Sequence, residues 1–304
     1  MTRLVAVAAL LALSTPALAD DQIPGHSVDP ATDGLITGIA LAASGGFSLI
    51  PIRENRPLWE SELVASDAAV HDNFSRRASH ISDALLATSL VAPAIYLTGS
   101  VIDDADGDRL ILYGQTIAIN AMLAQAAKHL VQRPRPYLYN QSAAARAYAR
   151  EAGTDAYKSF YSGHAALSFG AAVTGAYLIG ASGESRAARA VAWGAGLMVA
   201  STTASMRVRA GKHFYSDVVI GAVIGSAVGY LVPTLHDDDN SYSPTGSEVL
   251  AGATGILGGL LISRLLPLEK HPTGPEAPRS VLSRLSVSPA PMPDGFGFAI
   301  GGAL

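Results

Sequence analysis

The feature that most constrains the fold of this chain is a series of apolar segments, each about as long as a membrane-spanning helix. A spanning helix needs roughly 20 apolar residues, and five segments close to that length follow one another at regular intervals. They cover residues 84–102, 110–130, 165–181, 190–205 and 218–235. Charged residues make up only 15% of the chain, against about 25% in soluble domains. The sequence therefore predicts an all-α fold, a multi-helix transmembrane bundle.

The regions that flank this series differ in character. Residues 1–19 have the pattern of a secretory signal, with Arg3, an apolar run and a small-residue cleavage site before Asp20; a retained first anchor is the alternative. Residues 20–83 form an N-terminal apolar and amphipathic segment, whose stretch 34–52 either crosses the membrane or is re-entrant. The spacing of apolar residues from Trp59 to Val70 predicts an amphipathic helix along a surface.

The helical core is expected over residues 84–235, and residues 236–304 follow it with a different pattern. They comprise a weaker apolar stretch over 249–266, a Pro-rich linker over 267–280 and a small C-terminal β-hairpin. The hairpin prediction rests on alternating apolar residues around Asp294-Gly295.

Composition excludes several kinds of function. The chain has no cysteine, so thiol catalysis, thiolate metal sites and disulfides are ruled out. The net charge of −4 gives no reason to expect a nucleic-acid partner.

One polar stretch near residue 210 has the residues of a nucleophilic site. His213 and Asp217 are four residues apart, a spacing that puts both on one face of a helix. The carboxylate can then fix one imidazole nitrogen and leave the other bare and nucleophilic. Arg207 precedes them and can hold an anion with its planar set of donors. The alternative is a surface ion pair beside a basic loop.

A second stretch places cations at the end of an apolar segment. Lys128 and Arg135 are two helical turns apart, so both can point into one pocket, and Pro136 ends the helix. Cations at such a position are costly unless an anion joins them. The alternative is a set of basic side chains at the membrane boundary, which fits Arg133 well.

A third stretch, Ser162-Gly163-His164, stands directly before an apolar segment. Ser162 is a good N-cap, and the free N–H groups of a helix start form an anion site that Gly163 lets a ligand approach. His164 would then be placed to donate a proton to a leaving oxygen. An N-cap with an interfacial histidine is the alternative.

Together the three stretches resemble the type 2 phosphatidic acid phosphatase and vanadium haloperoxidase superfamily over roughly residues 80–235. Its motifs are matched in order and separation by Lys128, Arg135 and Pro136, then Ser162, Gly163 and His164, then Arg207, His213 and Asp217. Two positions depart from the motifs: Tyr161 replaces a proline and Met206 replaces a serine.

The resemblance implies a role for each matched residue. His213 would attack phosphorus and form a phosphohistidine, Asp217 would orient it, and His164 would protonate the leaving group. The phosphate oxygens would be held by Lys128, Arg135, Arg207, Ser162 and the Gly163 N–H. Because fixed cations hold the anion, we expect no metal and no cofactor, with vanadate as an inhibitor.

The expected function is hydrolysis of a lipid phosphate or lipid pyrophosphate, with membrane lipids around the enzyme. The resemblance implies a bacterial inner-membrane protein whose site faces the periplasm. Two alternatives stay open from the sequence: a soluble periplasmic acid phosphatase, and a haloperoxidase that uses vanadate as its cofactor.

Overall fold

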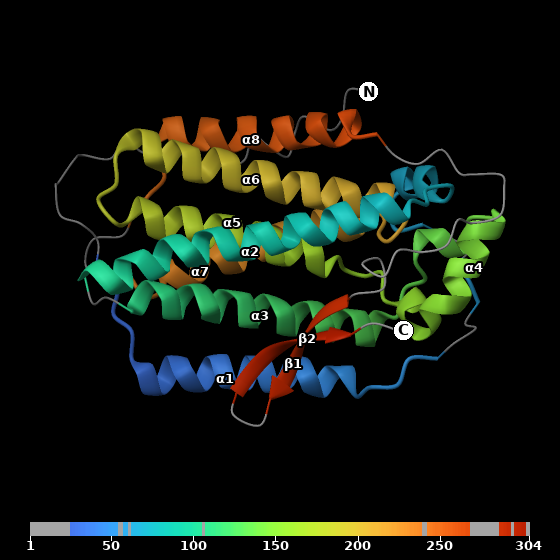
Figure 1. The fold of residues 1–304 in the computed structure, drawn as a ribbon, viewed down its shortest axis with the longest axis horizontal. Helices are drawn as coiled ribbons and strands as arrows, with labels where there is room; N and C mark the ends of the chain where they lie inside the picture. Colours follow the sequence, from blue (N-terminus) through green and yellow to red (C-terminus); the bar gives the residue numbers. More distant parts are fainter. Residues whose placement is uncertain are drawn as a thin grey trace. The chain divides into compact units, whose positions relative to one another are not determined.

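The computed structural model describes residues 25–53, 57–59, 62–104, 107–238, 242–267, 286–292 and 295–301. Eight α-helices lie within these ranges, and all but the short α4 run side by side (Figure 1). Their bounds are α1 Pro30–Ser48, α2 Arg76–Asp104, α3 Asp108–Val131, α4 Ala143–Ala152, α5 Gly163–Gly180, α6 Arg186–Arg209, α7 Tyr215–Thr234 and α8 Gly246–Leu265.

The length and surface of these helices suit a membrane. Four spans are long and apolar enough to cross one: Arg76–Gly99, Asp108–Leu138, Tyr215–Thr234 and Gly246–Leu265. Large apolar side chains on them point outward, among them Ile95, Val223 and Leu250, each more than half exposed. An apolar surface of this kind is favourable in lipid and costly in water. The predicted all-α bundle with membrane-length helices is confirmed.

Helix α5 is the centre of the bundle. It is buried along nearly its whole length and packs against α2, α3, α6 and α7. Small residues let these neighbours approach closely. At Gly225 of α7, for example, an added Cβ would lie 2.2 Å from the carbonyl oxygen of Ala166 in α5.

The N-terminal region differs from the prediction. Helix α1 begins at Pro30, where the Asp29 carboxylate caps it, and not after residue 33. It runs parallel to α3, since Asp33 near its start bonds Gln115 and Ser48 at its end bonds Gln125.

The prediction of an amphipathic helix from Trp59 to Val70 is wrong. The described part of that region holds a short 3₁₀ helix, η2 (Ala65–Val70), before α2 begins. Its apolar spacing arises because Val70 packs into the bundle core, with Asp67 buried beside it. The region therefore packs as a loop onto one end of the bundle.

The C-terminal unit, residues 269–304, is a separate compact unit. Its strands β1 (Ser286–Met292) and β2 (Gly295–Gly301) pair antiparallel, from Ser286 opposite Gly301 to Met292 opposite Gly295. The predicted hairpin is present, and the prolines at 289 and 291 lie within β1. The expectation for residues 1–19 lies outside the described residues, and so does that for the linker over 267–280 beyond its first residue.

We predict that Gly225→Ala destabilises the bundle, because the new methyl group would collide with the α5 backbone. Overpacking of this kind costs about 1–3 kcal/mol. Gly114→Ala in α3 is the matched control, since its Cβ would meet nothing within 4 Å. Thermal inactivation in detergent should separate the two variants. Equal melting temperatures would contradict the tight α5–α7 contact.

Candidate active site

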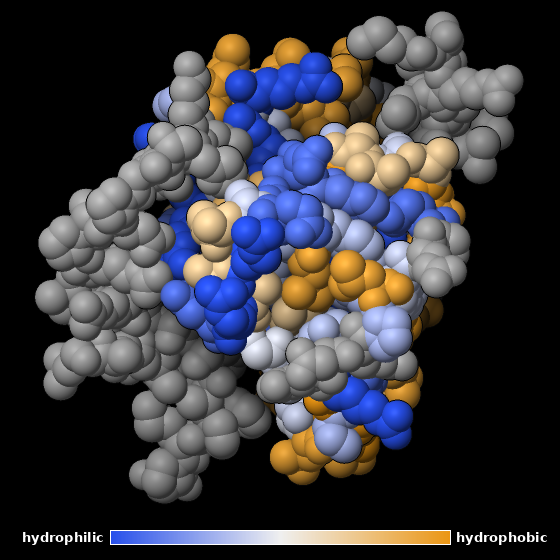
Figure 2. Space-filling model, turned by 90° about the vertical axis from the view of Figure 1, so that its right-hand side faces the viewer, coloured by the Kyte–Doolittle hydropathy of each residue, from blue (hydrophilic) through white to orange (hydrophobic). Residues whose placement is uncertain are grey.

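The residues singled out by the sequence come together at one end of the helical bundle. This is the end at which α3 and α6 finish and at which α5 and α7 begin. Figure 2 views this end of the bundle, with hydrophilic residues over much of the visible face and hydrophobic residues both among them and at its margins. The site is therefore built from residues at or near the ends of helices and in the loops between them.

His213 lies in the loop before α7, and its ring is held by the backbone. Its Nδ1 is 2.7 Å from the carbonyl oxygen of Ser159. A carbonyl can only accept a hydrogen bond, so Nδ1 carries the proton and Nε2 keeps a free lone pair. The predicted direct bond to Asp217 is not formed, because the nearest carboxylate oxygen is 3.8 Å away. The reason is that His213 precedes the helix, so the helical i,i+4 geometry does not apply to it.

The charge state of His213 follows from its surroundings. The side chain is buried, and the cations that act on it are Arg135, Arg207 and Lys128. Burial first, and repulsion by these cations second, hold the pKa of His213 well below its usual value. The imidazole is therefore neutral at pH 7, as a nucleophile must be.

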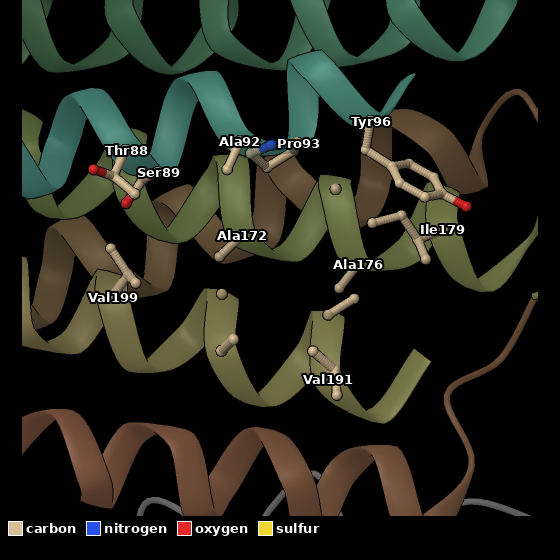
Figure 3. Close-up of a pocket in the computed structure, with 14 residues that line it drawn as sticks. Thr88, Ser89, Ala92, Pro93, Tyr96, Ala172, Ala176, Ile179, Val191 and Val199 are labelled. Carbon is tan, nitrogen blue, oxygen red and sulfur yellow. The ribbon is translucent and has the colours of Figure 1, made fainter. Parts of the chain in front are cut away.

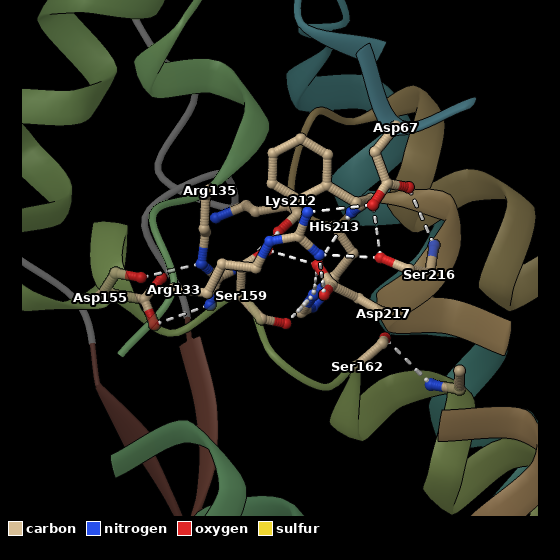
Figure 4. A network of polar contacts seen from close by, with 12 residues as sticks. Asp67, Arg133, Arg135, Asp155, Ser159, Ser162, Lys212, His213, Ser216 and Asp217 are labelled. Atoms are coloured by element: carbon tan, nitrogen blue, oxygen red, sulfur yellow. Dashed lines mark hydrogen bonds and ion pairs between the residues drawn. The ribbon is translucent and has the colours of Figure 1, made fainter. Parts of the chain in front are cut away.

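Asp217 is fully buried in the first turn of α7 and fixes the loop that holds His213 (Figure 4). Its Oδ2 accepts from the Phe214 N–H at 2.9 Å and from the Ser159 hydroxyl at 2.5 Å. Its Oδ1 accepts from Arg133 at 2.7 Å. Since Ser159 also supplies the carbonyl that holds His213, Asp217 orients the imidazole through Ser159.

Arg133 is at the centre of this network and not at a membrane boundary, which corrects the sequence interpretation. Its side chain is 1% exposed. Besides Asp217, the guanidinium pairs with Asp67 at 3.0 Å and Glu62 at 3.2 Å, and it lies 3.8 Å from the Phe214 ring centre. Asp67 in turn accepts from the Ser216 N–H and hydroxyl. Arg133 thus joins the loop before α2 to the start of α7.

Arg135 is fixed on the other side of His213 by the loop after α4. It donates to the Asp155 carbonyl at 2.8 Å and to the Asp155 carboxylate at 2.9 Å. Desolvation opposes ionisation of Asp155, but Arg135 and Lys212 outweigh it and lower its pKa to about 2. Lys212 donates to the Tyr148 hydroxyl, and burial followed by Arg135 lowers the pKa of Lys212 to about 7.

Lys128 and the start of α5 form the next part of the site. The Ser162 hydroxyl caps α5 by accepting from the Ala165 N–H. A Cβ on Gly163 would lie 2.9 Å from Lys128 Nζ, so the glycine lets the ammonium group lie close against the backbone. This places a cation directly against the helix start, where an anion is already favoured.

Arg207 and His164 meet at a carboxylate that the sequence analysis did not identify. Asp83 of α2 lies with its Oδ1 2.8 Å from His164 Nε2 and 3.1 Å from Arg207 Nη1. Arg207 also donates to the Ser82 hydroxyl at 3.2 Å. Arg207 is in the last turn of α6 and is 5% exposed.

The two positions that depart from the motifs are both buried. Met206 packs against Ala78 of α2 and Ala210, so it faces the core. Tyr161 packs with Ala124 and Ala166 beside the start of α5. Both side chains serve packing, which explains how the site tolerates these departures.

Comparison with known proteins gives one match. A sequence model described as the PAP2 superfamily matches residues 109–241. A search of curated proteins and a search of solved structures found no match.

The matched segment runs from α3 to just beyond α7 and holds all the residues that carry the motifs. This part of the chain is similar to the PAP2 superfamily, in agreement with the resemblance to type 2 phosphatidic acid phosphatases. The match supports a hydrolase with phosphatase-type activity. Helix α2, with Asp83, lies before the matched segment.

We predict that Arg133→Ala is severe. The change would leave Asp67 and Asp217 buried without their cation, and breaking a buried pair costs about 3–5 kcal/mol. Activity and thermal stability should both fall strongly. Arg209→Ala is the control, because Arg209 donates only to the Leu266 carbonyl among the hydrogen bonds found here. Losses of equal size in the two variants would show that the network around Arg133 has no special weight.

Proposed function

We propose that this protein hydrolyses lipid phosphates through a phosphohistidine formed on His213. The observation that carries the proposal is the protonation and orientation of the His213 imidazole. Its Nδ1 donates to the Ser159 carbonyl, its Nε2 has no hydrogen bond from the part of the chain that the structure describes, and the charges of Arg135, Arg207 and Lys128 act on it. A neutral, oriented imidazole facing a cationic pocket is the arrangement that attack on a phosphate ester requires.

The first step would transfer the phosphoryl group to the enzyme. The His213 Nε2 lone pair forms a bond to phosphorus, and the bond from phosphorus to the ester oxygen breaks. His164 gives its proton to that oxygen, which leaves as an alcohol. Lys128, Arg135 and Arg207, with the start of α5 at Ser162 and Gly163, stabilise the charge on the phosphoryl oxygens.

The second step would release phosphate. Water attacks the phosphorus of the phosphohistidine while His164, now neutral, accepts a proton from that water. The bond to His213 breaks, and phosphate leaves. Asp217 and Arg133 take no part in bond making; they hold Ser159 and the His213 loop in place.

An apolar cavity supports a lipid substrate. It has a volume of about 240 Å³ and lies between α2, α5 and α6 (Figure 3). The same three helices carry Asp83, His164 and Arg207 at the site. The cavity begins at Thr88, Ala172 and Val199, five to eight residues further along each helix. At 1.5 Å per residue that is about 8–12 Å from the site, within reach of a hydrocarbon chain attached to a bound phosphate.

The cavity extends along the helices away from the site, as a hydrocarbon chain attached to a bound phosphate would. Its far end is lined by Tyr96, Ile179 and Val191, about 20 Å or more from the site residues on the same helices. One leaflet of a bilayer has a hydrocarbon depth of about 15 Å. A chain that lies in the cavity would therefore run along the bundle for at least the depth of one leaflet.

We further propose that the site faces the periplasm from a bacterial inner membrane. Helix α1 runs from the opposite end of the bundle toward the site. If α1 crosses the membrane, this orientation puts Gly25 on the cytoplasmic side. A cleaved signal over residues 1–19 would put Gly25 on the periplasmic side. A cleaved signal and a periplasm-facing site are therefore incompatible if α1 crosses the membrane, and we keep the periplasm-facing site.

We predict that the full chain in detergent releases phosphate from a long-chain lipid phosphate without any metal. Chelation by EDTA should leave the rate unchanged, because the cations of the pocket are side chains. Vanadate, which mimics phosphate, should inhibit in competition with the substrate. The same chain should show a higher kcat/KM for the lipid than for glycerol phosphate.

Two results would contradict the proposal. Activity that vanishes with EDTA and returns with a divalent ion would mean that a metal holds the phosphate. Equal kcat/KM values for the lipid and for glycerol phosphate would remove the role of the cavity.

A further inference from the structure

The Asp83 carboxylate occupies a position that the phosphatase motifs do not assign. Its Oδ1 contacts both His164 Nε2 and Arg207 Nη1, at 2.8 and 3.1 Å. The side chain is 51% exposed, so it borders the open part of the site and not the core. An anion is therefore fixed beside the residue that protonates the leaving group.

The charged residues of the site are unevenly distributed around His164. Arg135 is anchored by Asp155, and Lys128 lies against Gly163 at the start of α5. On the His164 side, the ion pairs found among the described residues add a carboxylate, Asp83, and the cation there, Arg207, is already paired with it. The leaving group would thus depart toward a fixed carboxylate that is already paired with Arg207.

We propose that Asp83 makes this site selective for phosphate monoesters of an uncharged alcohol over diphosphates. The inference rests on the proposed function and narrows its substrate class. Asp83 acts as a positioning residue, because it contacts His164 and Arg207.

Phosphate monoesters and diphosphates have leaving groups that differ in charge and in their need for a proton beside Asp83 and His164. An alkoxide leaving group needs a proton. Burial and the Arg207 charge lower the pKa of His164 to about 3, and the hydrogen bond to Asp83 opposes that shift, so Asp83 favours the protonated ring that supplies the proton. The leaving group of a diphosphate is itself a phosphate, which carries negative charge and departs with little need of a proton. Beside Asp83 that charge is repelled, since like charges a few ångströms apart disfavour each other strongly.

The test compares two substrates with the same hydrocarbon chain, a long-chain alkyl monophosphate and the corresponding alkyl diphosphate. The full chain in detergent micelles is assayed as wild type and as Asp83→Asn. Wild type should prefer the monophosphate in kcat/KM. Asp83→Asn should shift the ratio toward the diphosphate about tenfold or more, through a lower kcat on the monophosphate and a lower KM for the diphosphate.

Two further variants separate charge from structure. Asp83→Glu keeps the charge and should keep the preference. Glu151→Gln removes a carboxylate of similar exposure, 48%, that pairs with Arg76 and has no place in the chemistry; its ratio should equal that of wild type.

The outcomes are distinct. A wild type that prefers the diphosphate, or an Asp83→Asn ratio within twofold of wild type, would overturn the inference and leave the proposed function standing. If the Asp83→Asn protein does not accumulate, the kcat/KM ratio of Asp83→Ser is compared with that of wild type, and the same two outcomes apply. A wild type that releases phosphate from neither substrate would overturn the proposed function and this inference with it.

Discussion

The buried pairing of Arg133 with Asp217 and Asp67 is the interaction on which the rest of the site depends. It joins the end of α3, the start of α7 and the loop before α2. A buried charge is tolerated only when it is paired and hydrogen-bonded, so each partner fixes the others. Ser159 extends this network to His213, so the orientation of the His213 ring follows from contacts among buried side chains and the backbone.

Around this fixed centre, the bundle supplies charge of both signs. Cations at the ends of α3 and α6 face the start of α5, while Asp155 and Asp83 each hold one of the arginines from outside. This arrangement keeps the pocket in place without substrate, since unpaired cations would repel one another. It also gives the site two different sides, one bounded by the loop after α4 and one formed by α2, α5 and α6, the helices that also line the apolar cavity.

Sequence reasoning recovered those parts whose signal is local. Helices α2, α3 and α5 to α8 follow apolar runs bounded by polar turns, and the motif residues stand at fixed spacings. Helix α4 was missed because it is short and carries no apolar run. Asp67, Ser159 and Asp83 were missed because their partners are far along the chain: Asp67 bonds Ser216 across 149 residues, and Asp83 bonds Arg207 across 124. Arg133 was misread for the same reason, since a basic residue at a helix end looks alike whether it faces lipid headgroups or a buried carboxylate.

The account rests on His213 as the residue that receives the phosphoryl group, and one measurement addresses that directly. The full chain is mixed with a lipid phosphate labelled in its phosphorus and denatured within milliseconds at alkaline pH, where phosphohistidine survives. Peptide mapping should place the label on His213, and His213→Ala should carry none. Label on His164, or label that persists in His213→Ala, would contradict the assignment of the nucleophile.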